Sequence, residues 1–164
     1  MRLGTGALVR IRPLHMADED RLKELFYHLS SDSTYQRFMA HKKRHPHEEM
    51  LDLVDVDYES TMALVATHEG EESPELIAMA RYDVDPATRL GDVALVVVDA
   101  WQGKGVGTLI FRRLAELARD RGVLGFTADV LVQNGRMLAI FNKSGLRVES
   151  VLEAGVYRVR MTFE

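Results

Sequence analysis

A glycine-rich turn between an apolar run and an amphipathic run is the feature that most constrains the fold of this chain. Residues 93–98 (VALVVV) are apolar throughout, residues 99–108 (DAWQGKGVGT) form the turn, and an amphipathic segment starts at Leu109. Glycines let backbone N–H groups converge without side chains between them, and they occur here at Gly103, Gly105 and Gly107. The positive end of the dipole of a following helix strengthens such a site for anions. This order predicts a buried strand, a turn that cradles a pyrophosphate, and a helix.

The spacing of the glycines distinguishes between known phosphate-binding loops. The Walker pattern G-x-x-x-x-G-K-[ST] does not occur in the chain, and the dinucleotide pattern G-x-G-x-x-G fails because the third glycine comes one residue early. The pattern that fits is Q/R-x-x-G-x-G, which resembles the coenzyme A loop of the GNAT superfamily of N-acetyltransferases. The resemblance implies that acetyl-CoA is bound by Gln102, Gly103, Lys104, Gly105, Val106, Gly107 and Thr108. Taken alone, the loop is equally compatible with a tight turn after a strand.

Two further segments, in the expected order, support the same resemblance. Asn134 opens a segment that ends near the string FNKSGL at residues 141–146, and this is similar to the second GNAT motif. Asparagine is a good N-cap and Gly145 suits a helix C-terminus, so a plain capped helix is the alternative. Residues 9–14 (VRIRPL), followed by Asp18, resemble the opening strand and helix of the superfamily. The resemblance therefore covers most of the chain.

Composition narrows the class of protein. The 164 residues suit a single domain, here residues 1–164, with a hydrophobic core. The absence of cysteine excludes a disulfide, a thiolate nucleophile and a cysteine-ligated metal. The net charge of −4 argues against nucleic-acid binding. Neither a signal-peptide pattern nor a membrane-length apolar run is present, so we expect a cytoplasmic protein without a membrane partner.

Hydrophobic periodicity predicts an α/β protein. Strands are expected at 7–11, 61–67, 76–82, 90–98, 126–131, 146–152 and 156–163, and helices at 18–29, 33–39, 47–54, 108–121 and 134–143. The fold class is a GNAT-like mixed, mostly antiparallel central sheet flanked by helices on both faces. The superfamily resemblance further implies that two central strands separate to admit the acyl donor, which the sequence itself does not show.

A closer resemblance concerns the acceptor. Residues 29–38 (LSSDSTYQRF), and residues 56–58 (VDY) followed by 62–66 (MALVA), resemble the bacterial branch of protein-lysine acetyltransferases. A capped helix with a core aromatic is the alternative interpretation of the first string. Some members of this branch carry a cyclic-nucleotide-binding or CoA-ligase-like domain, and the given sequence contains neither. The branch implies that the preferred acceptor is a lysine side chain of another protein.

Acetyl transfer to an amine needs a base, a donor that polarises the thioester carbonyl, and a route for the leaving thiolate. Asp92 is the candidate base, where the branch often has glutamate, and its shorter side chain favours a bridging water. The alternative for Asp92 is a solvated residue at a strand end. The family implies a backbone N–H donor on the central strand, here at Val96, Val97 or Val98.

The remaining candidates follow from the second motif. The family places a tyrosine general acid where this chain has Phe141, which cannot donate a proton, so the thiolate leaves unassisted or another group helps. Tyr157 is a candidate by residue type only. Phe141 stays among the expected cofactor-binding residues, together with Asn134 for the pantetheine arm and Lys143 for the 3′-phosphate.

The sequence thus predicts an acetyl-CoA-dependent N-acetyltransferase that transfers acetyl directly to a primary amine. A small-amine acetyltransferase and a non-catalytic module that senses acyl-CoA are the alternatives, and a homodimer stays open. We expect no metal, since the histidines at His41, His45 and His47 are interleaved with Lys42, Lys43 and Arg44, whose charge opposes a cation.

Overall fold

A single seven-stranded sheet forms the centre of the molecule. The structure is a computed structural model that describes residues 8–27, 60–68 and 75–163. The expected helices at 33–39 and 47–54 and the three histidines of 41–47 lie outside these residues. The strands are β1 (Val9–Pro13), β2 (Thr61–His68), β3 (Glu75–Asp85), β4 (Leu90–Val97), β5 (Gly125–Leu131), β6 (Arg147–Glu153) and β7 (Val156–Thr162).

The sheet has the strand order β1-β2-β3-β4-β5-β7-β6. Every neighbouring pair is antiparallel except β4 and β5, which are parallel. β1 continues through Pro13, two residues further than predicted, because an edge strand tolerates a residue without an N–H. The predicted mixed, mostly antiparallel sheet is confirmed.

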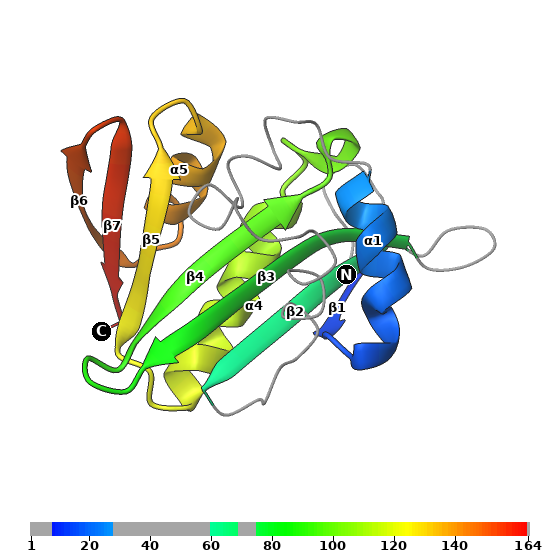
Figure 1. Cartoon of the computed structure of the whole chain (residues 1–164), viewed down its shortest axis with the longest axis horizontal. Coiled ribbons are helices and arrows are strands. Elements are labelled where there is room, and N and C mark those ends of the chain that lie inside the picture. The colour runs from blue at the N-terminus through cyan, green and yellow to red at the C-terminus, as the bar shows by residue number, and fades with distance from the viewer. Residues whose placement is uncertain (1–7, 28–59, 69–74, 164) are drawn as a thin grey trace.

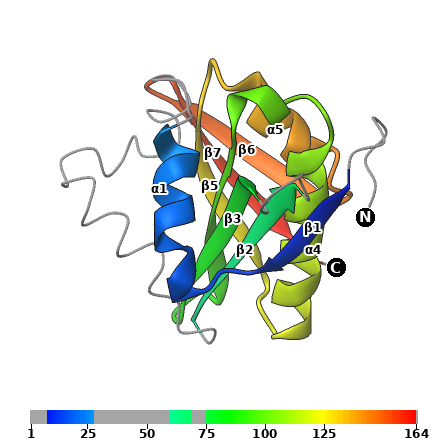
Figure 2. The same ribbon diagram turned by 90° about the vertical axis from the view of Figure 1, so that its right-hand side faces the viewer.

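Helices cover both faces of this sheet (Figures 1 and 2). The helix α1 (Glu19–Tyr27) follows a short 3-10 helix, η1 (Met16–Asp18), and packs on one face. On the other face lie α4 (Val106–Asp120), which begins after the 3-10 helix η2 (Asp99–Trp101), and α5 (Gly135–Asn142). Both helices begin within two residues of the predicted positions.

The core explains why α4 docks as it does. Its buried residues recur at helical spacing, as expected for one apolar face: Val106, Gly107, Ile110, Phe111, Leu114 and Ala118. Phe111 contacts the rings of Phe126 on β5 and Phe141 on α5, with centroids 5.7 and 5.1 Å away. This aromatic cluster joins the helix layer to the half of the sheet that carries β5.

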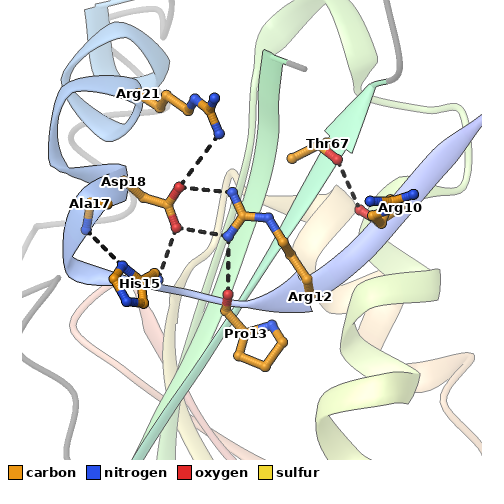
Figure 3. A network of polar contacts seen from close by, with 8 residues as sticks. All are labelled: Arg10, Arg12, Pro13, His15, Ala17, Asp18, Arg21 and Thr67. Carbon is orange, nitrogen blue, oxygen red and sulfur yellow. Dashed lines mark hydrogen bonds and ion pairs between the residues drawn. The ribbon is translucent and has the colours of Figure 1, made fainter. Parts of the chain in front are cut away.

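An ion-pair network holds α1 against β1 (Figure 3). Asp18 is buried and accepts two hydrogen bonds from the Arg12 guanidinium, at 2.8 and 2.7 Å, and one from the backbone N–H of His15 at 2.8 Å. Arg21 lies 3.8 Å away. The hydrogen bonds from Arg12 hold the pKa of Asp18 below its usual value of 3.8, although burial acts in the opposite direction.

We expect Asp18→Asn to lower the free energy of unfolding by about 2 kcal/mol at pH 7, the usual scale for hydrogen bonds to a charged group. Because the pKa of Asp18 is depressed by folding, its stabilisation is present above the unfolded pKa and is lost as pH falls through the folded pKa. Urea denaturation at pH 7 and in acid tests this. Asp20→Asn, at an exposed position in the first turn of α1, should leave stability unchanged. An equal loss for Asp18→Asn at both pH values would contradict the assignment.

Candidate functional site

The central sheet opens between β4 and β5. These two strands pair only at their beginnings, where Leu90, Gly91 and Asp92 meet Gly125, Phe126 and Thr127. β4 then continues to Val97 and β5 to Leu131 without pairing with each other again, and Figure 1 shows them separating toward α5. The gap opens at the end of β4 that leads into the glycine-rich turn.

A cavity of about 520 Å³ lies at this opening. Three segments line it: the end of β4, the glycine-rich turn with the start of α4, and α5 with the two residues before it. Among the expected cofactor-binding residues, the lining includes Val96, Val97, Gln102, Gly103, Gly105, Gly107, Thr108, Asn134 and Lys143. Backbone groups, apolar side chains and two cationic residues, Arg136 and Lys143, thus line one cavity, which suits a ligand with an apolar part and an anionic part.

Gln102 connects the turn to its surroundings. Its Nε2 donates to the carbonyl oxygen of Val97 at 3.0 Å and to Asp99 Oδ1 at 3.4 Å. Arg136, at the start of α5, donates from Nη1 to Gln102 Oε1. The glutamine of the Q-x-x-G-x-G pattern therefore fixes the turn against both the strand end and α5.

Glycines shape the turn in two different ways. Gly105 is the N-cap of α4 and has φ of +92°, a conformation that L side chains rarely adopt. Gly107 lies inside α4, where a Cβ would come within 2.6 Å of Ile140 Cδ1 and 3.5 Å of Val97 Cγ2. The first glycine permits the turn, and the second lets α4 approach both α5 and β4.

Four of the expected cofactor-binding residues do not line the cavity: Val98, Lys104, Val106 and Phe141. Phe141 is buried, with 2% of its surface exposed, against Phe111. Val106 is buried in the first turn of α4. Lys104 is exposed, and its Nζ lies 5.3 Å from the centroid of the Trp101 ring.

Backbone hydrogen bonding separates the three candidate N–H donors on β4. Val98 does not line the cavity, and its N–H donates to the carbonyl oxygen of Ile77 at 2.9 Å. Because antiparallel residues alternate between facing the partner strand and facing away, the N–H of Val96 also points to β3, and that of Val97 points toward the gap. Val97 is thus the residue of the three whose N–H faces the cavity side of the strand.

The helix α5 and the residue before its N-cap contribute lining residues that were not among the expected ones: Gln133, Gly135, Arg136, Met137, Ala139 and Ile140. Asn134 caps this helix as predicted, accepting from the N–H of Met137 at 3.2 Å. Arg136, Ile140 and Lys143 are three or four residues apart and so share one helix face. Helical spacing counted from the Asn134 cap is the signal that could have found them.

Asp92 does not line this cavity. It is exposed at the last paired position before the gap, and Thr127 Oγ1 lies 3.5 Å from its Oδ1. It lines a separate open hollow of about 420 Å³ with Thr127, Ala128, Asp129, Arg158, Val159 and Arg160. Since the Val97 side chain faces α4 and strand residues alternate, Asp92 points to the opposite face of the sheet. Tyr157, on β7, lines neither the cavity nor the hollow.

Within residues 8–27, 60–68 and 75–163, no group of three or more His, Cys, Asp or Glu side chains is placed to hold a metal ion. The helices in that part of the chain are too short or too polar to span a membrane.

Comparison with known proteins gives a consistent result. The sequence model of the acetyltransferase (GNAT) family matches residues 22–146. An acetyltransferase of Pseudomonas aeruginosa is 31% identical over 121 residues, which cover 73% of this chain and 64% of that protein. The acetyltransferase Pat of Mycolicibacterium smegmatis is 33% identical over 148 residues, covering 88% of this chain and 43% of that protein. The chain thus spans less than two thirds of the length of either relative.

Among solved structures, the GNAT domain of S. lividans PAT is similar over nearly the whole chain. The TM-score is 0.86 at 31% identity, and the match covers 99% of this chain and 95% of that domain.

Proposed function

This chain belongs to the acetyltransferase (GNAT) family, and from that premise we propose that it transfers the acetyl group of acetyl-CoA directly to a primary amine. The preferred acceptor is a lysine side chain of another protein. The observation that carries the proposal is the cavity at the separation of β4 and β5, because it joins a glycine-rich turn to an apolar strand end. Such a cavity accommodates the two chemically different ends of an acyl-CoA.

The residues of the cavity fit the parts of this donor. The turn from Gly103 to Gly107, at the N-terminus of α4, offers backbone N–H groups and a helix dipole to the pyrophosphate. Lys143 and Arg136 add positive charge at α5. Asn134 and the end of β4 border the route that the pantetheine arm would take. Acetyl-CoA supplies the activated thioester.

The protein then has two tasks at the reacting carbon. The N–H of Val97 faces the cavity and would stabilise the negative charge that develops on the thioester oxygen. Asp92, at the point where β4 and β5 part, would accept the proton that the ammonium must lose before it can attack. Because Asp92 lies on the other face of the sheet, a bridging water would carry this proton. The acceptor would therefore approach from the open hollow that Asp92 lines.

Two features favour a protein acceptor over a small amine. The hollow at Asp92 is open and not an enclosed pocket, so a side chain that projects from a large surface can enter it. The string at residues 29–38 resembles the protein-lysine acetyltransferases.

Calorimetric titration with acetyl-CoA and CoA, followed by a free-thiol release assay against protein and small-amine acceptors, tests the proposed function. We expect tight binding and thiol release that depends on a protein acceptor. Binding with release only in the presence of small amines would favour the small-amine enzyme. Binding without release against any acceptor would favour the acyl-CoA sensor, and absence of binding would contradict the cavity assignment.

We expect Asp92→Asn to reduce kcat roughly 100-fold, within the range for loss of a general base, while the affinity for acetyl-CoA is unchanged. The affinity is preserved because Asp92 lies outside the cavity. Steady-state kinetics and calorimetry on the same preparations measure both quantities.

Asp129→Asn is the matched control for this variant. Asp129 is exposed, lines the same hollow and carries the same charge, but it lies beyond the point where β4 and β5 part. It should retain most of the turnover. Equal losses in the two variants would mean that the charge of the hollow matters and that Asp92 is not the base.

A further inference from the structure

The strand β6 is an exposed edge of the sheet. It pairs with β7 on one side and is the last strand in the order, as the left-hand end of the sheet in Figure 1 shows. Six of its seven residues are exposed, including the apolar side chains of Val151 (59%) and Leu152 (53%). An exposed edge that carries apolar side chains is a template for pairing with another strand.

The hairpin to β7 determines which backbone groups of β6 point outward. Ala154 and Gly155 both have positive φ, 50° and 78°, which is the signature of a two-residue type I′ turn. Glu153 and Val156 beside this turn are then a hydrogen-bonded pair, and the pairs alternate along the ladder. Val148, Ser150 and Leu152 therefore direct their N–H and C=O groups away from β7.

The sequence of β6 (RVESVLE) is complementary to itself when a second copy runs antiparallel to it about Ser150. Arg147 then lies opposite the partner subunit's Glu153, and the reverse pair forms at the other end. Val148 lies opposite the partner's Leu152, and Ser150 lies opposite the partner's Ser150. Each of the three outward-facing residues meets an outward-facing residue, as an antiparallel ladder requires.

The terminal charges and the Val148–Leu152 pairs fall on opposite faces of this arrangement, and Val151 lies on the face of the charges, opposite the partner's Glu149. Arg147 and Glu153 would form non-hydrogen-bonded pairs, whose side chains come closest in an antiparallel ladder. Within the chain, Arg147 already contacts Glu149 at 3.6 Å, and Glu153 contacts Arg158 at 3.9 Å. Such exposed ion pairs contribute little to stability, so they do not prevent new pairs with the partner. Val148 and Leu152 would meet on the other face and cover apolar surface that is now exposed.

The alternative registers are poorer. A two-fold axis at Val148 or at Leu152, the other outward-facing positions, leaves only three residues of β6 opposite residues of the partner's β6. Axes at Glu149 or Val151 place inward-facing residues opposite each other and bring Glu149 against the partner's Glu149 or the partner's Glu153. Ser150 is the centre at which all seven residues pair and the charges attract.

We propose that two copies of this chain associate through β6, antiparallel about Ser150, into one continuous sheet. The interface is isologous, since each copy uses the same strand, and so it closes as a dimer. It lies at the opposite side of β5 and β7 from the gap, and it leaves the 520 Å³ cavity open.

Sedimentation velocity of the full chain over a concentration series tests the proposal. We expect dimers, and we expect Ser150→Pro to give monomers, because proline removes an outward N–H from the centre of the interface. The matched control is Ser150→Thr at the same residue, which keeps the backbone N–H and favours a strand, and it should leave the dimer intact. A monomeric wild-type chain would overturn the proposal, as would an unchanged dimer in Ser150→Pro.

Charge exchange gives a second test that does not depend on proline being tolerated. Arg147→Glu and Glu153→Arg should each weaken dimerisation roughly tenfold, because each change places like charges together at both ends of the interface. The double variant Arg147→Glu/Glu153→Arg restores opposite charges and should return the dimer Kd to near the wild-type value. A double variant as weak as the single variants would contradict the register.

Discussion

Replacing Gly105 with valine should weaken acetyl-CoA binding roughly 100-fold or more, which corresponds to about 2.7 kcal/mol. Gly105 has φ of +92° at the N-cap of α4, and a β-branched residue is a strong outlier in that region. No heavy atom lies within 4 Å of the position that a Cβ would take, so the cause is backbone strain and not a clash inside the protein. To relieve the strain, the turn must move, and the backbone N–H groups that line the cavity would move with it.

Gly155→Val is the control that distinguishes the general effect of backbone strain from a local effect on the binding site. Gly155 also has positive φ (+78°) and open space around the Cβ position, but it lies in the β6–β7 hairpin and does not line the cavity. It should cost a similar amount of stability and leave acetyl-CoA affinity unchanged. Calorimetric titration of both variants measures the difference, and normal affinity in Gly105→Val would show that the turn does not hold the ligand.

Gly125→Ala should be the most destabilising small substitution in the central sheet, with a loss of about 3 kcal/mol, at the upper end for overpacking. A Cβ at Gly125 would lie 2.1 Å from the carbonyl oxygen of Met161, which belongs to the backbone of β7 and cannot rotate away. Gly125 also pairs with Leu90, so β4, β5 and β7 would all have to shift. The expected change in Tm is a decrease of about 6–12 °C for a domain of this size.

Gly135→Ala is the matched control for that prediction. Gly135 is the first residue of α5, is exposed, and has no heavy atom within 4 Å of the Cβ position. Alanine favours helix more than glycine does, so the variant should be neutral or slightly stabilised. Thermal unfolding of both variants measures the difference in Tm. A Tm for Gly125→Ala close to that of Gly135→Ala would show that the backbone of β7 can shift to make room for the Cβ.

Much of the fold could be predicted because the local signals agree with the tertiary contacts. The buried face of α4 recurs at helical spacing, Asn134 caps α5, and apolar runs mark β2 and β4. Each of these elements carries its own boundary signal, so the expected and observed limits differ by only a few residues.

The site was harder to predict, because it depends on relations between distant segments. The separation of β4 from β5 arises where pairing stops after Asp92, and nothing in either strand's own sequence marks that point. Motif position placed Phe141 near the ligand, whereas packing against Phe111 buries it in the core. The assignment of Val98 as a donor likewise depends on which strand its N–H faces, and Ile77 is 21 residues away in the sequence.

The short pairing between β4 and β5 has a mechanical consequence. It divides the sheet into a larger unit, β1 to β4, and a smaller unit, β5, β7 and β6. Only three register pairs, all between β4 and β5, join the two units. Opening between the units costs few backbone hydrogen bonds, so their relative motion should be softer than motion within either unit. A ligand in the cavity touches β4 on one side and α5 on the other. Its binding should therefore restrict the relative motion of the two units at the seam, which is the boundary between β4 and β5. Amide protons near the seam would then report ligand binding even where they touch no ligand atom.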